Sequence, residues 1–329
     1  MLRFFIAFFF NTSAFLSFAQ TNVIPVDDVS KSELDKNIPL KNFLDKNFIF
    51  LDGAFIHGDF EGSDSINLKP FVKRVSVAPV YLYAREVSVK QYMAFFIENN
   101  GVYKGINLSP KADDIEGLPK DFLKNFISDK GNSNFPIMGI NRAQAIAYCT
   151  WYAEWLNEKF NKNPLSLYLV KVRLPLDAEF QLAELKGFST ENLENPAIRI
   201  STEIYTDFAK YKTNTQQTLG KIPFSPVDQN RSPKLPIYNI AGNVAEWVLD
   251  RPRNLQMATD SGPRIEYYRI PRQLKNVGSN YIGGVKGGSF YHSAFYLQPG
   301  VTIPLDITKG YLWVGFRPVL TFIKSEKVN

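Results

Sequence analysis

Hydrophobic residues recur with two different periods along this chain, and that alternation limits the folds it can adopt more than any other feature. Residues 48–58 and 74–89 form short apolar runs that alternate every second residue and are broken by Gly or Pro, as strands and turns are. Elsewhere, apolar residues recur at helical spacing. The chain therefore predicts a mixed α+β domain.

Two of the helical segments begin with the same capping signature. Ser88 is followed by Gln91, and Asn141 by Gln144, just before apolar residues at helical spacing. These patterns predict helices over residues 88–99 and 141–159, the second of which contains Cys149. A third, shorter helix is expected over residues 177–185, where acidic side chains in the first turn complement the helix dipole.

Long stretches without periodicity separate these elements. Residues 189–236 and 251–282 show neither a repeat nor a low-complexity tract, so we expect binding loops on a small scaffold. A single cysteine excludes a disulfide-stapled protein, and an aromatic content of 14% excludes a disordered chain. No shift in composition suggests a second domain.

The first twenty residues have the pattern of a secretion signal. Arg3 precedes an apolar run, and a small-x-small site ends at Ala19, which predicts a signal peptide over residues 1–19. A membrane anchor is the alternative, but the run over residues 4–10 is far shorter than the ~20 residues that a span needs. Because no cysteine follows the site, a lipid-modified cysteine is excluded, and membrane association would have to come through a partner. We expect a weakly ordered leader over residues 20–46, one domain over residues 47–323 and a tail over residues 324–329.

The charge balance is mildly basic. The chain has 38 Lys and Arg against 32 Asp and Glu, a net charge of +6, which does not argue for nucleic acid. The basic excess is concentrated in one segment with interleaved tyrosines, which is either a solvated loop or a docking surface for an acidic partner. The residues of this basic segment are Arg251, Arg253, Arg264, Tyr267, Tyr268, Arg269, Arg272 and Lys275. Phosphate-loop, dinucleotide, nucleophile-elbow and zinc-protease motifs do not occur.

The chain carries a series of longer motifs in a fixed order. They are FLDGAFIHGD at residues 50–59, VYLYAREVSVKQYMAFF at 80–96, FPIMGINRAQAIAYCTWYAEWL at 135–156, VRLPLDAEFQLAEL at 172–185, PIYNIAGNVAEWVLD at 236–250, KGGSFYHSAFY at 286–296 and VGFRPVL at 314–320. Motifs of this kind in this order resemble the formylglycine-generating-enzyme (sulfatase-modifying factor) family. The resemblance implies a single α+β domain, rich in irregular loops and related to C-type-lectin folds.

Residues within these motifs are expected to stabilise the fold. Gly242 can adopt a positive φ, and Trp247 offers a large apolar side chain for burial. Arg173 and Arg317 lie in apolar surroundings and need acceptors, for which Glu179 and Glu246 are suitable. A direct binding role is the alternative for these charges. The expected fold determinants are Arg173, Glu179, Gly242, Trp247, Gly287, Gly288 and Arg317.

Catalysis by the family's copper chemistry is not expected. The resemblance implies that enzymes of this family bind copper through two cysteines shortly after the GGS motif, and these positions fall on His292 and Leu297. Cys149 lies far from them in sequence and is expected to be a buried structural thiol. A related branch holds iron with three histidines, whereas this chain has only His57, expected in a turn, and His292. We expect no catalytic cofactor.

A structural calcium ion is a separate expectation. Family members carry structural Ca²⁺, and the resemblance places Asn243 and Glu246 in a stretch that supplies oxygen ligands, which Ca²⁺ prefers. An uncharged polar turn without metal is the alternative.

Within the family, the wording of residues 73–96 resembles the gliding-motility and type IX secretion proteins of Bacteroidota. That resemblance implies a non-catalytic periplasmic scaffold that binds envelope proteins, with an oligomer or ring left open. We expect no membrane-spanning segment in the mature chain. Two alternatives remain: an oxidase of the same fold with unassigned metal chemistry, and a carbohydrate or peptidoglycan binder that uses Tyr and Trp on the loops.

Overall fold

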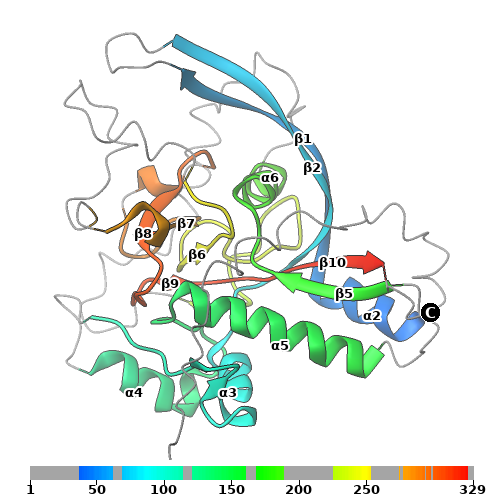
Figure 1. The fold of residues 1–329 in the computed structure, drawn as a ribbon. Coiled ribbons are helices and arrows are strands. Elements are labelled where there is room, and N and C mark those ends of the chain that lie inside the picture. The colour runs from blue at the N-terminus through cyan, green and yellow to red at the C-terminus, as the bar shows by residue number, and fades with distance from the viewer. Residues whose placement is uncertain are drawn as a thin grey trace, which may run out of the picture.

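A four-stranded antiparallel sheet with helices on both faces forms one half of the molecule (Figure 1). The strand order is β1-β2-β10-β5, so the strand nearest the C-terminus lies between two earlier ones. Helices α2 and α5 cover one face and α6 covers the other. These elements are β1 (Phe48–Glu61), β2 (Lys69–Tyr83), β5 (Tyr168–Arg173), β10 (Val319–Lys324), α2 (Ile38–Asn47), α5 (Arg142–Phe160) and α6 (Asp177–Phe188). The computed structural model describes residues 37–61, 69–113, 121–160, 168–188, 225–252, 274, 277–292, 294–297 and 299–324.

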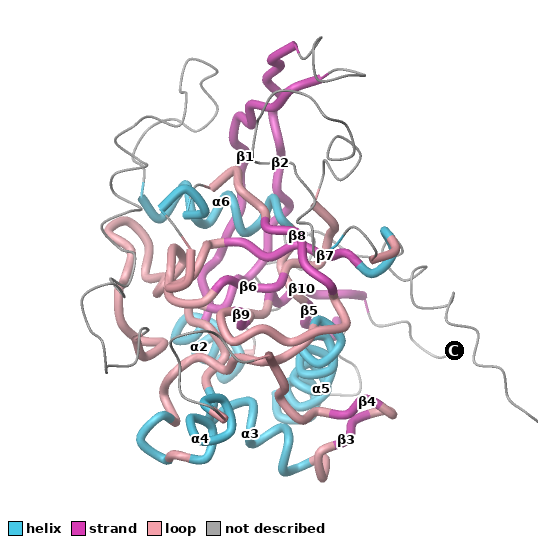
Figure 2. The backbone as a smooth tube through the Cα atoms, turned by 90° about the vertical axis from the view of Figure 1, so that its left-hand side faces the viewer, coloured by secondary structure: helices cyan, strands magenta, loops and turns pink. Residues whose placement is uncertain are grey.

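A second four-stranded sheet, of order β8-β7-β6-β9, lies in the middle of the molecule (Figure 2). Strands β6 and β9 run parallel, whereas the other neighbours are antiparallel. Its strands are short: β6 (Ala245–Trp247), β7 (Ile282–Lys286), β8 (Ile303–Asp306) and β9 (Val314–Gly315). The remaining elements are α3 (Val89–Glu98), β3 (Val102–Tyr103), β4 (Ile106–Asn107), α4 (Phe122–Ser128) and the 3-10 helices η3 (Lys130–Asn132), η7 (Ser279–Tyr281) and η8 (Ala294–Leu297).

Both predicted capping boxes are present. The Ser88 hydroxyl accepts from the Gln91 N–H at 3.3 Å, while the Gln91 side chain accepts from the Ser88 N–H at 2.9 Å. Asn141 and Gln144 exchange the equivalent bonds at 2.9 and 2.8 Å. Helices α3 and α5 therefore begin where the sequence predicts, and α6 extends to Phe188, beyond the predicted end at residue 185.

The expectation of a weakly ordered leader is wrong for residues 38–46, which belong to α2. Asn37 caps this helix, since its side-chain oxygen accepts from the Leu40 N–H at 3.3 Å. Leu40 and Leu44 are fully buried in the core, and this burial stabilises a helix whose apolar residues are too few to stand out in the sequence. Residues 20–36 lie outside the described residues. Lys324, expected to begin the tail, is the last residue of β10.

Strands β1 and β2 form a long hairpin that extends past the other two strands of its sheet (Figure 1). Strand β10 pairs with β2 only at Val319–Leu82 and Leu320–Tyr81. Within the hairpin, His57 pairs with Lys73, so this histidine lies in the middle of a strand and not in the expected turn. The alternation that predicted the strand was correct, and Gly58 does not interrupt it.

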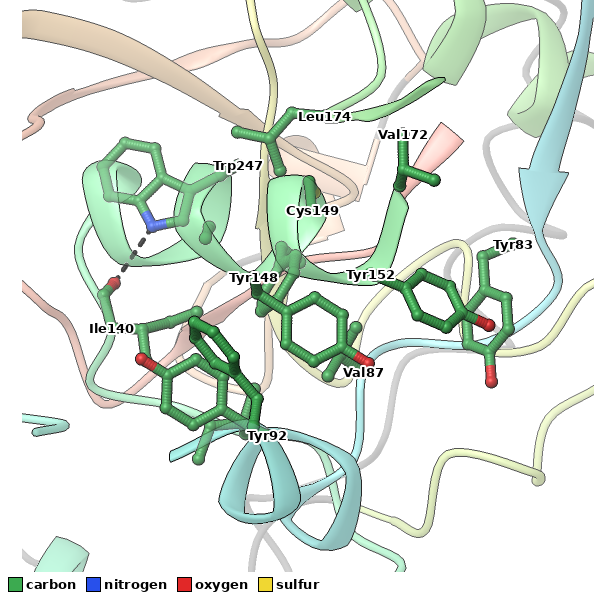
Figure 3. Packing of buried hydrophobic residues seen from close by; sticks show 14 of the residues in the cluster. Tyr83, Val87, Tyr92, Ile140, Tyr148, Cys149, Tyr152, Val172, Leu174 and Trp247 are labelled. Atoms are coloured by element: carbon green, nitrogen blue, oxygen red, sulfur yellow. Dashed lines mark hydrogen bonds between the residues drawn. The ribbon is translucent and has the colours of Figure 1, made fainter. Parts of the chain in front are cut away.

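The apolar core is divided by the first sheet. One cluster packs under α2 and α5, and the other packs between the sheet and α6, because successive strand residues point to opposite faces. Figure 3 shows the first cluster, in which the Tyr148 ring stacks on that of Tyr92 at 6.1 Å and Cys149 lies next to them on α5. The fully buried Trp247 donates its indole N–H to the Ile140 carbonyl at 3.1 Å. Within the described ranges, the helices lack the combined length and apolarity required to cross a bilayer.

Candidate functional site

Arg317 and Glu246 form a completely buried ion pair between the two sheets. Nε and Nη2 of Arg317 each donate to one oxygen of the Glu246 carboxylate, at 2.6 Å. Nη2 also donates to the Tyr238 carbonyl at 2.9 Å. Because Glu246 is on β6 and Arg317 lies in the short connection between β9 and β10, this pair fixes the second sheet to the first.

A second bidentate pair joins β5 to α6. Arg173 donates from Nη1 and Nη2 to the two oxygens of Glu179, at 2.7 and 2.6 Å. The Glu179 carboxylate also accepts from the Leu176 N–H at 2.7 Å, in the turn that leads into the helix. Both acidic partners suggested by the sequence are therefore the ones that the structure brings to these arginines, and all four charges cross-link secondary structure.

Glu86 is a third buried carboxylate, and sequence reasoning missed it. The side-chain amides of Asn239 and Asn243 each donate to one of its oxygens, at 2.9 Å. Burial raises the pKa of Glu86 well above its usual value, and the nearby Glu246 carboxylate raises it further. The available signal was the charged pair Arg85-Glu86 inside an otherwise apolar motif, between Ala84 and Val87.

Lys286, at the end of β7, is the centre of a second buried cluster. Its ammonium donates to the carbonyls of Pro299 at 2.6 Å and Val301 at 3.2 Å, and it lies 3.4 Å from Asp177 and 3.7 Å from Glu184. The two Glu184 oxygens make no hydrogen bond, and desolvation raises the pKa of this carboxyl to about 8 although Lys286 opposes the shift. Through its contacts with the Pro299 and Val301 carbonyls, Lys286 holds the end of the loop that follows the GGS motif.

The residues proposed for calcium do not fit that ion. Both Glu246 oxygens accept from Arg317, and the Asn243 side-chain oxygen accepts from the Ser225 N–H at 2.9 Å. The Arg317 guanidinium thus binds both Glu246 oxygens, which Ca²⁺ would need as ligands. The described part of the chain holds no cluster of three or more His, Cys, Asp or Glu side chains able to bind a metal.

The residues at the copper positions do not fit a two-thiolate site either. Leu297 is fully buried in the core between the first sheet and α6 and offers no ligand atom. His292 is half-buried, and its Nδ1 lies 2.7 Å from the Ser289 hydroxyl. Cys149 belongs to the core on the opposite face of the sheet, where burial raises its pKa far above the usual value and disfavours the thiolate.

His292 instead belongs to a group of rings that we call the aromatic patch: Tyr291, His292, Tyr296, Tyr311 and Trp313. Tyr291 stacks nearly parallel on Trp313, with ring centroids 6.2 Å apart and planes at 14°. The imidazole of His292 lies 4.5 Å from Trp313, edge to face, and 4.9 Å from Tyr296. Tyr291 is 59% exposed, and the other members are half-buried. At the position of one of the family's copper-binding cysteines, the patch is therefore a continuous group of rings that extends from half-buried side chains to the exposed Tyr291.

Backbone conformation fixes the loop beneath this patch. Gly288 has φ of +63°, and a Cβ there would lie 2.8 Å from the Tyr296 carbonyl oxygen, so only glycine fits. Gly242, with φ of +88°, fulfils the prediction of a positive φ, and its N–H donates to the Gly287 carbonyl at 2.8 Å. The predicted glycines therefore hold the GGS loop against the AGN turn.

The basic segment is described only at its start. Arg251 is exposed, and its guanidinium donates to the Asn280 side chain at 3.3 Å. The other members, Arg253, Arg264, Tyr267, Tyr268, Arg269, Arg272 and Lys275, lie outside the described residues.

Comparison with known structures places the fold. PvdO from Pseudomonas aeruginosa is similar with a TM-score of 0.50 and 17% identity, over 83% of this chain and 94% of that one. Treponema denticola variable protein 1 is similar with a TM-score of 0.48 and 20% identity, over 83% of this chain and 93% of that one. CarF is similar with a TM-score of 0.46 and 16% identity, over 84% of this chain and 99% of that one. At these identities the likeness concerns the fold alone. No curated protein sequence matches significantly.

The two sheets, with α2 and α5 on one face of the first and α6 on the other, form a mixed α+β domain whose sheets are joined by the buried Glu246–Arg317 pair. The sequence agrees, since the family described as "Sulfatase-modifying factor enzyme 1-like domain" matches residues 44–322. The chain belongs to this family.

Proposed function

We propose that this protein is a non-catalytic member of its family that binds partner proteins. The observation that carries the proposal is Leu297, a fully buried aliphatic side chain at a position where the family's copper enzymes have a cysteine. An aliphatic side chain cannot bind Cu(I), which prefers soft thiolates. The other of the two cysteine positions holds His292, whose ring packs against Trp313 and Tyr296.

The buried charges support a scaffold role. The Glu246–Arg317 and Glu179–Arg173 pairs satisfy each other and connect separate elements, so these four groups are used for structure. Catalytic acids and bases usually lie where a substrate can reach them. These groups fix the relative positions of the two sheets, which is what a rigid docking platform requires.

We further propose that the protein works in the bacterial envelope, as part of a gliding-motility or type IX secretion complex. The signal-peptide pattern of residues 1–19 and the family branch that residues 73–96 resemble support this location. Partners with acidic surfaces suit the basic segment at residues 251–275.

Copper binding tests the lack of catalysis. The mature protein should neither retain Cu(I) nor convert a sulfatase-type cysteine peptide to formylglycine with copper and oxygen supplied. The control is the double variant His292→Cys/Leu297→Cys, which restores both thiols and should gain Cu(I) affinity if the two positions are equivalent to the family's pair. Peptide turnover by the wild-type protein above a metal-only blank would support the oxidase alternative and end this proposal.

Two measurements test the envelope role. Intact mass of protein from the native host should correspond to a chain beginning at Gln20, and a retained Met1 would revive the membrane anchor. Crosslinking followed by mass spectrometry should identify envelope proteins. Reversal of Arg264, Arg269 and Arg272 to Glu should slow association with such a partner more than it speeds dissociation, and an unchanged association rate at low salt would exclude the basic segment from the interface.

A further inference from the structure

We propose that the aromatic patch is a carbohydrate-binding platform, with Tyr291 as the surface on which a pyranose ring stacks. This inference goes beyond the proposed binding of protein partners. It begins from the stacked pair of Tyr291 and Trp313, in which the indole supports the more exposed phenol from one side.

The chemistry of the patch suits a sugar better than an apolar peptide. A pyranose has one face of C–H groups, which packs on an aromatic ring, and a rim of hydroxyls, which need hydrogen-bond partners. Tyr and Trp combine an apolar body with a polar edge, and the patch adds the imidazole of His292. Leu297, the aliphatic residue next to Tyr296, is fully buried, whereas a site for an apolar peptide would be expected to include exposed aliphatic side chains. Among the residues of the loop 287–300 whose side-chain exposure is described, Tyr291 is the one large apolar side chain that is strongly exposed.

The patch is also preorganised, which lowers the entropic cost of binding. The Ser289 hydroxyl accepts from the Tyr291 N–H at 3.1 Å and lies 2.7 Å from Nδ1 of His292. Further along the loop, the buried ammonium of Lys286 holds the Pro299 and Val301 carbonyls. Tyr291, His292 and Tyr296 are thus presented from a loop fixed at both ends.

Titration with soluble oligosaccharides tests the proposal. Cellotetraose and chitotetraose both present flat, β-linked pyranose faces, and binding can be followed by calorimetry and by tryptophan fluorescence, since Trp313 lies in the patch. At least one of them should bind saturably. Tyr291→Ala should weaken binding by about tenfold, which corresponds to ~1.4 kcal/mol, while Tyr291→Phe, which retains the ring face, should lose much less.

Tyr281 provides a matched control, because it is 56% exposed, close to the 59% of Tyr291, but belongs to η7. Tyr281→Ala should bind the oligosaccharide as the wild-type protein does. Equal losses in the two alanine variants would overturn the proposal, as would the absence of saturable binding to both sugars. A protein partner that is released by Tyr291→Ala but not by oligosaccharide would assign the patch to protein docking instead. These readouts are independent of copper binding and turnover, so they can fail separately from the proposed function.

Discussion

Arg317 donates two hydrogen bonds from its guanidinium to the two carboxylate oxygens of Glu246, which is 71 positions away in the sequence. Both side chains are fully buried. Removing one member leaves a buried charge without a partner. We expect Arg317→Met to lower the free energy of unfolding by about 3–5 kcal/mol, measured by denaturant unfolding. Arg317→Lys should also be costly, since an ammonium cannot make the bidentate contact.

An exposed pair provides the control for that comparison. Lys104 and Glu154 are also 2.6 Å apart, but their side chains are 60% and 53% exposed. Lys104→Ala should therefore cost less than ~1 kcal/mol. Similar losses for Lys104→Ala and Arg317→Met would show that burial does not set the strength of the Arg317–Glu246 pair.

Glu184 should make the fold lose stability as pH rises from about 4.5 to about 8. Desolvation raises the pKa of its carboxyl in the folded protein to about 8, above the usual value, while Lys286 lowers it and Asp177 and Glu246 raise it. Because the folded state binds the Glu184 proton more tightly than the unfolded state, the protonated carboxyl stabilises the fold relative to the ionised one. This contribution to the free energy of unfolding is complete below the unfolded-state pKa. It is then lost as pH rises toward 8, by at most ~1.4 kcal/mol per pH unit from this group.

The neutral isostere Glu184→Gln removes that titration. Its free energy of unfolding should vary less with pH than that of the wild-type protein, and at pH 8 to 9 the variant should be the more stable of the two. Parallel curves for the two proteins would mean that Glu184 is already ionised in the folded state at neutral pH. Glu86 remains in both proteins, and its raised pKa acts in the same direction, so some pH dependence should persist.

Gly288→Ala should destabilise the loop that carries Tyr291, His292 and Tyr296 of the aromatic patch. The positive φ is unfavourable for alanine, and the new Cβ would meet the Tyr296 carbonyl oxygen at 2.8 Å. We expect a loss of about 1–3 kcal/mol in denaturant unfolding. Gly300 is in the same loop, but a Cβ there meets nothing within 4 Å. Gly300→Ala should consequently leave stability nearly unchanged, and an equal loss there would refute the steric argument.

The thiol of Cys149 should resist alkylation in the folded protein. It is fully buried in the aromatic core, and its pKa is raised, so little reactive thiolate forms and the reagent cannot reach it. Labelling with iodoacetamide, followed by intact mass, should be slow in native buffer and complete in denaturant. Rapid labelling of the native protein would place this thiol in an accessible site.

Local signals predicted the local structure. The Ser88–Gln91 and Asn141–Gln144 pairs specify helix starts through contacts only three residues apart, and the alternation of residues 48–58 specifies a strand. The family motifs predicted the fold class and the glycine turns.

The remaining features depend on distant residues or on very short elements. Strand β9 has two residues, Val314 and Gly315, and β6 has three, which is too few for any periodicity to appear. The role of Glu86 could not be predicted because its hydrogen-bond partners, Asn239 and Asn243, lie more than 150 positions later in the sequence. The aromatic patch likewise depends on Trp313 meeting Tyr291, which the sequence separates by the whole of β8.

The position of β10 has a consequence for how the chain is made. Val319 pairs with both Leu82 and Arg173, so β10 fills the space between two strands that the ribosome produces much earlier. Until residues 319–324 are synthesised, β2 and β5 lack their shared neighbour, and the core on either side cannot close. Since pairing over such long sequence separations forms slowly, we expect this domain to stay unfolded in the nascent chain until β10 has left the ribosome.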